Sequence, residues 1–145
     1  MEEKIAGLEG AFARYRSDIE AYEKKARPTD GLLGFGRSLK DDVCHDRLDE
    51  SVAQIVTEIC AEAPSFEAAE RAIRLLLRED IPAWPLAAQW MLRAVERHAL
   101  PLIPYLSAPQ AQELYRDYQK RYPPWDRLPA QKEVCQALKA RAHSA

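Results

Sequence analysis

The apolar residues near the amino terminus recur at steps of three and four. The series is Ile5, Leu8, Phe12, Tyr15, Ile19, Tyr22 and Ala26. This spacing places the side chains along one side of an α-helix, in the a/d pattern of helices that pack together. We therefore predict a long amphipathic helix over residues 1–26, ended by Arg27 and Pro28, since the residue before a proline disfavours helical backbone.

Such an apolar seam needs a partner surface, and two partners fit it. The first is the rest of this chain, and the second is another protein or a second copy of the chain. Tyr15 and Tyr22 stand where a tight two-stranded coiled coil prefers leucine, whereas tyrosine is common at protein interfaces. Both alternatives stay open, and the interface hypothesis assigns these residues to the contact: Ile5, Leu8, Phe12, Tyr15, Ile19 and Tyr22.

The remainder of the chain has no alternating strand pattern. We expect residues 27–46 to form an irregular, Gly-rich segment, because it holds Gly31, Gly34 and Gly36. Further helices are predicted over 47–63, 65–78, 85–99, 107–121 and 129–140, with Ser65 as a cap and Ser107 in a capping box. The predicted fold is all-α: one domain over 1–145, a bundle of about six helices, compact over 47–142.

Helical spacing also predicts which side chains point inward. Phe66 is expected inside the helix over 65–78, and Leu86 and Trp90 inside the helix over 85–99. Tyr115, Tyr118 and Tyr122 have core spacing, although the basic residues between them are also typical of partner or nucleic-acid contacts. The following Pro123, Pro124 and Trp125 are predicted to form a packed corner.

Composition and charge restrict the partners. The chain has 145 residues, a formal net charge of −2 and three cysteines at Cys44, Cys60 and Cys135, an odd number unlike a secreted disulfide framework. The amino terminus lacks the pattern of a signal peptide, and residues 99–106 are too short an apolar run to cross a membrane. We expect a cytoplasmic protein without a membrane partner, and no nucleic-acid partner.

The charges are unevenly distributed along the chain. Residues 1–80 carry 12 basic and 18 acidic side chains, whereas residues 81–145 carry 9 basic and 5 acidic ones. The two parts can attract each other inside one molecule, or the basic part can form a face for an acidic partner.

Cys44 and His45, with acidic residues on both sides, are the first candidate ligand site. Adjacent helical residues point about 100° apart, so the thiol and imidazole would need partners from elsewhere. The alternative is that the aspartates stabilise a helix start and Cys44 is a buried small residue. With the nearby basic residues, the ligand hypothesis comprises Arg37, Lys40, Cys44 and His45. It predicts a cavity of several hundred Å³ beside them.

No cysteine or histidine spacing typical of a metal site occurs, and no motif implies a cofactor or a reaction. We therefore expect a non-enzymatic protein–protein interaction module, such as a small cytoplasmic adaptor, regulator or inhibitor. The alternative is a ligand-binding or catalytic protein that uses the site at Cys44 and His45.

Overall fold

The computed structural model describes residues 1–25 and 35–144. Within these ranges the chain is helical and contains no strand, which confirms the all-α prediction. The α-helices are α1 (Glu2–Lys25), α3 (Phe35–Ala61), α4 (Phe66–Leu76), α5 (Leu86–Val95), α6 (Ala108–Arg121) and α7 (Pro129–Ala142). Three 3-10 helices connect them: η1 (Ile81–Ala83), η2 (Glu96–Tyr105) and η3 (Pro124–Asp126).

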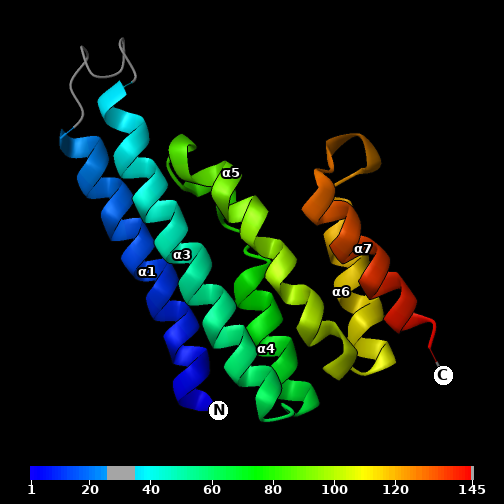
Figure 1. The fold of residues 1–145 in the computed structure, drawn as a ribbon. Helices are drawn as coiled ribbons and strands as arrows, with labels where there is room; N and C mark the ends of the chain where they lie inside the picture. Colours follow the sequence, from blue (N-terminus) through cyan, green and yellow to red (C-terminus); the bar gives the residue numbers. More distant parts are fainter. Residues whose placement is uncertain (26–34, 145) are drawn as a thin grey trace.

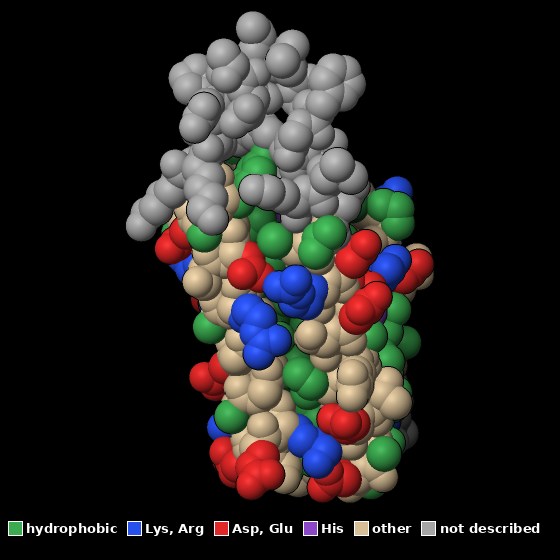
Figure 2. Space-filling view, turned by 60° about the vertical axis from the view of Figure 1, so that its left-hand side comes forward, with side chains coloured by type: hydrophobic (Ala, Val, Ile, Leu, Met, Phe, Trp, Pro, Cys, Tyr) green, Lys and Arg blue, Asp and Glu red, His purple; other side chains and the backbone are tan. Residues whose placement is uncertain are grey.

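The helices are arranged around two antiparallel pairs. Figure 1 shows α1 and α3 side by side on one flank of the molecule and α6 with α7 on the other, with α4, α5 and η2 between them. Over the exposed surface of the α1 flank, acidic and basic side chains are interspersed (Figure 2). None of the helices in the described ranges combines the length and the apolar character needed to cross a membrane.

The seam of α1 is buried within its own chain. Its side chains are between 0 and 8% exposed: Ile5, Leu8, Phe12, Tyr15, Ile19 and Tyr22. Exposed ion pairs flank the seam: Lys4 Nζ lies 2.5 Å from the carboxylate of Glu62, which directly follows α3, and the guanidinium of Arg71 on α4 lies 2.5 Å from the carboxylate of Glu2. The structure therefore shows the intrachain alternative, and these six side chains are not displayed to a second molecule in this fold.

The prediction of an irregular segment over 27–46 is wrong for residues 35–46. α3 begins at Phe35, so residues 35–46 are helical, whereas Gly31 and Gly34 lie outside the described residues. The physical reason is the length of α1, because a helix of 24 residues needs a comparably long neighbour to cover its seam. His45, which the Tyr15 hydroxyl of α1 contacts, lies in the part of α3 that precedes the predicted helix start at residue 47.

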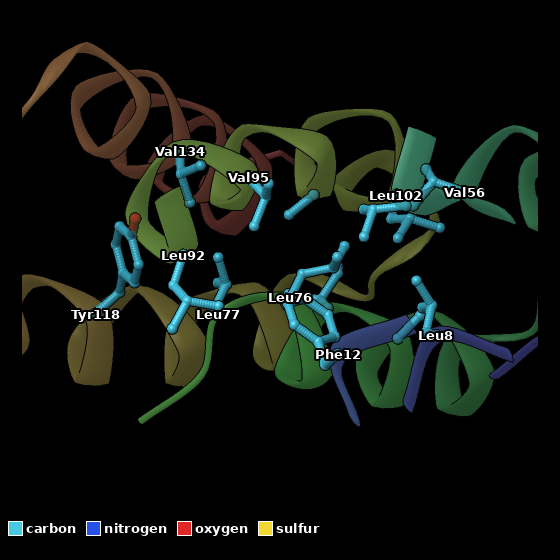
Figure 3. Packing of buried hydrophobic residues seen from close by; sticks show 14 of the residues in the cluster. Leu8, Phe12, Val56, Leu76, Leu77, Leu92, Val95, Leu102, Tyr118 and Val134 are labelled. Carbon is cyan, nitrogen blue, oxygen red and sulfur yellow. The ribbon is translucent and has the colours of Figure 1, made fainter. Parts of the chain in front are cut away.

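The core runs through the whole molecule. Figure 3 shows side chains from the six α-helices and from η2 converging on it, among them Phe12 on α1, Leu76 on α4 and Leu102 on η2. Leu102 belongs to η2, which carries Pro101 and Pro104 inside the helix yet buries Ala99, Leu102 and Ile103. Residues 100–106, which lie between the predicted helices over 85–99 and 107–121, thus belong to a buried part of the fold, and η2 extends through Tyr105.

Local signals place several helix starts correctly. Ser65 accepts a hydrogen bond from the backbone N–H of Ala68 at the start of α4. Ser107 and Gln110 form the predicted capping box of α6, with each side chain bound to the backbone of the other residue. These caps fix where α4 and α6 begin, and α4 packs against η2.

Candidate functional site

The predicted site residue His45 belongs to the core. Its side chain is 3% exposed, and the Tyr15 hydroxyl lies 2.6 Å from its Nδ1. The ring of Trp90 on α5 meets the imidazole edge-on, with 4.7 Å between the ring centroids. His45 thus joins α1, α3 and α5 and is enclosed by aromatic neighbours.

Cys44 points to a different place, the groove between α1 and α3. The cavity that it lines there has a volume of about 10 Å³, room for roughly one water molecule. Arg37 and Lys40 lie on α3, but their side chains fall outside the described residues. The cavity beside Cys44 is much smaller than the several hundred Å³ that the ligand hypothesis predicts, and among the described residues no group of three histidine, cysteine or acidic side chains is arranged to hold a metal ion.

His98 also has a structural contact. Its Nε2 lies 2.7 Å from the Asp49 carboxylate, which links η2 to α3. Together with the ring contact between Trp90 and His45, the contact between His98 and Asp49 packs one side of α5 and η2 along α3.

The most unusual polar group is Glu96, the first residue of η2. It is fully buried, and it accepts hydrogen bonds from the Tyr118 hydroxyl (2.9 Å) and the Gln131 amide (2.6 Å). The Tyr122 hydroxyl lies 3.4 Å from the second carboxylate oxygen, and the Arg121 guanidinium 3.9 Å from it. Desolvation outweighs these donors and raises the pKa of Glu96 to about 7.

Gln131 extends this network to the surface. Its amide also donates to the Arg93 carbonyl, and its side-chain oxygen accepts from the Leu128 backbone N–H. Arg93 in turn donates to the backbone carbonyl of Asp126 at 2.7 Å. The network therefore holds η3 and the start of α7 against α5.

Sequence reasoning missed Glu96 and Gln131, although a signal existed. Gln131 lies at the inward spacing set by Val134, Cys135 and Leu138, where an apolar residue is expected. Glu96 directly follows the buried Val95. A polar residue in an apolar stripe indicates a buried hydrogen-bond network.

The largest cavity that we describe has a volume of about 330 Å³ and lies between α4 and α6. Its lining is Arg74, Leu77, Glu79, Leu114, Asp117, Tyr118 and Arg121. Arg121 donates to the carbonyls of Leu77 and Arg78 at the end of α4, and Arg74 binds Glu70 at 2.9 Å. Arg121 therefore holds the end of α4 to α6, whereas Arg74 pairs with Glu70 on its own helix and lies 3.9 Å from Glu113 on α6.

A second feature is exposed apolar surface around α5 and η3. Leu86 is 82% exposed, Trp90 55%, Trp125 86% and Leu128 46%. We call these four residues the aromatic surface. Sequence reasoning placed Leu86 and Trp90 inward and Trp125 in a packed corner, and these predictions are wrong, as is the one for Phe66, which is 57% exposed.

The turn of α5 explains the exposure of Leu86 and Trp90. The buried face of this helix consists of Ala88, Met91, Leu92 and Val95. Because each residue turns the helix by about 100°, Leu86 and Trp90 lie together on the opposite face, one turn apart. Both are apolar, but they belong to a second stripe that the described residues cover only in part, through the contact of Trp90 with His45.

The two halves of the aromatic surface are neighbours through Arg93. This residue lies one turn after Trp90, and it binds Asp126, the residue next to Trp125. The exposed face of α5 therefore lies between α3, which it touches at His45, and η3.

Comparison with protein-family models, curated proteins and solved structures found no match to this chain.

Proposed function

We propose that this protein is a non-enzymatic protein–protein interaction module and that the aromatic surface is its binding face. The observation that carries the proposal is the exposure of two of the three tryptophans on adjoining elements, Trp90 on α5 and Trp125 on η3. Trp84, the third, is 4% exposed, so this chain is able to bury tryptophan. Exposed apolar patches mark interaction sites, and tryptophan is enriched among residues that dominate binding energy.

The shape of the surface favours a protein over a small molecule. The described cavities at α4–α6 and α1–α3 are lined by other residues. The aromatic surface instead displays side chains outward from a helix and a short turn. Such a surface gains binding energy when a second apolar surface covers it and excludes water.

A cytoplasmic adaptor, regulator or inhibitor remains our proposal for the kind of protein. The free thiols of Cys60 and Cys135 support a reducing compartment, where cysteines stay reduced. Burial raises the pKa of both thiols, which favours an inert structural role for them over nucleophilic chemistry.

A photo-crosslinking amino acid tests the proposal. It would replace Leu86, which is exposed and lies beside Trp90, and in a matched control it would replace Phe66 at the start of α4. We expect a discrete protein adduct in the host cell from position 86, lost when Trp90→Ser is added and weak from position 66. Circular dichroism would establish that each variant folds.

Equal adducts from both positions, or adducts that do not depend on Trp90, would contradict the proposed binding face. The result distinguishes a specific face from general stickiness, because Phe66 is exposed to a similar extent as Trp90.

A further inference from the structure

We infer that the aromatic surface is self-complementary and that its partner is a second copy of this chain. This inference rests on the proposed function and names the occupant of the same face. It follows from the charges on the two sides of α5, which have opposite sign.

The α3 side of the aromatic surface is acidic. Asp46 directly follows His45, whose ring contacts Trp90, and Glu50 lies one turn further along the same helix. Both carboxylates are exposed. Asp49, between them, binds His98 and so faces α5 and η2. Acidic groups thus follow α3 along the edge that adjoins Trp90.

The α7 side and the end of α5 are basic on balance, because Arg97, Arg127 and Lys132 outnumber the exposed Glu133 that follows Lys132. Lys132 lies one turn after Leu128, and its backbone N–H bonds to the Leu128 carbonyl. Arg97 is exposed just beyond α5, and Arg127 lies between Asp126 and Leu128. The carboxylate of Asp126 is paired with Arg93, so these two charges cancel and the net charge of this edge stays positive.

The same division holds for the molecule as a whole. The helices α1, α3 and α4 lie within residues 1–80, where acidic residues exceed basic ones by 18 to 12. The helices α6 and α7 lie within residues 81–145, where basic residues exceed acidic ones by 9 to 5. Figure 1 shows α5 between these two groups of helices.

If two copies meet across a two-fold axis that runs along α5, their oppositely charged edges attract each other. In a two-fold contact each surface meets itself after rotation, so the acidic edge of one copy faces the basic edge of the other, twice. The apolar side chains of α5 and η3 meet at the centre, and charged groups form the rim, as in ordinary protein interfaces. The net charge of −2 per chain opposes this contact only weakly.

Sedimentation velocity on the full-length chain tests the inference. We expect reversible formation of a species of twice 16.5 kDa between about 1 and 200 µM, with weaker association in about 0.5 M salt. Leu86→Ser and Trp125→Ser should each raise the dissociation constant at least about tenfold, since they remove apolar centre contacts. Phe66→Ser, which removes an exposed apolar side chain elsewhere, should leave the dissociation constant unchanged.

Charge-reversal variants test the two-fold contact more sharply. A variant with Asp46→Lys and Glu50→Lys should be monomeric, and so should one with Arg97→Glu and Lys132→Glu, because each homodimer then pairs like charges. An equal mixture of the two should form a heterodimer, because the reversed edges are complementary across the same axis.

A chain that stays monomeric over the whole concentration range would overturn the inference, and so would a dimer that Leu86→Ser, Trp125→Ser and Phe66→Ser leave equally stable. A monomeric chain that still gives a Trp90-dependent adduct from position 86 with a different protein would retain the proposed function and refute only self-association. Loss of both signals would refute both proposals.

Discussion

The α1 seam and the outer face of α5 share a sequence signal but differ in the structure. Both present large apolar side chains at helical spacing. Leu86 and Trp90 are predicted to point inward, whereas for the α1 seam the sequence leaves cover by this chain and cover by another molecule both open. The α1 seam is 0 to 8% exposed, whereas Leu86 and Trp90 are 82 and 55% exposed. The difference is the presence of a covering surface: α3 runs along the whole of α1, but the chain offers α5 cover on one face only.

The comparison teaches that helical spacing identifies apolar faces without telling which of them the same chain covers. On α5 the spacing of Ala88, Met91, Leu92 and Val95 forms one stripe, and Leu86 and Trp90 begin another. We propose that the second stripe is available to another molecule, and five substitutions can break or sharpen the comparison.

The largest expected effect comes from exchanging one tryptophan for alanine in each region. Trp84 is 4% exposed and stacks on Tyr15 of α1, so Trp84→Ala should lower the free energy of unfolding by about 3–5 kcal/mol. Trp125→Ala should change it by less than about 0.5 kcal/mol. Urea denaturation measures both, and similar losses would mean that η3 packs as tightly as the core.

The second effect concerns Glu96, behind the aromatic surface. Its pKa of about 7 lies above the ordinary value of 4.5, so the folded state binds this proton more tightly than the unfolded state does. Stability from this group is fully present below pH 4.5 and is lost as the pH rises to about 7, by about 3 kcal/mol in total.

Glu96→Gln should remove this pH dependence. The glutamine oxygen can accept from Tyr118 and Gln131 as the carboxylate does, and its amide can donate to the Tyr122 oxygen. Urea denaturation between pH 5 and 8 should show a sloping stability for the natural chain and a flatter one for the variant. Identical slopes would rule out titration of Glu96 in this range.

The third effect is smaller and lies at the boundary of the two regions. Tyr15→Phe removes the hydroxyl that binds His45 and leaves the packing of the ring, so we expect a loss of about 1–2 kcal/mol in the free energy of unfolding. Chemical denaturation at pH 7.5 would measure it. No loss would indicate that His45 is held by its ring contacts alone.

The smallest effect should come from Leu86→Ser. Because this side chain is 82% exposed, its removal should change the free energy of unfolding by less than about 0.5 kcal/mol, while it weakens association. Thermal unfolding at a concentration well below the dissociation constant measures the stability of the monomer separately from the effect on association. A clear drop in monomer stability would place Leu86 in the core after all.

The helical fold and several helix ends could be predicted from the sequence, because caps such as Ser65 and Ser107 act locally and the α1 seam repeats without interruption. The start of α3 could not, since its first turns depend on the distant α1. The aromatic surface could not be predicted for a related reason, because the exposure of Trp125 depends on which helices reach η3. Glu96 and Gln131 could be noticed as polar residues at or beside inward positions. Their hydrogen-bond partners lie on other helices and are known only from the folded structure.

The account depends on the face of α5 that the chain leaves uncovered, and crosslinking from position 86 reports on it most directly. The account predicts an adduct with the mass of two chains, formed at low salt and abolished by Trp90→Ser. A folded protein that yields no Trp90-dependent adduct from this position would contradict it.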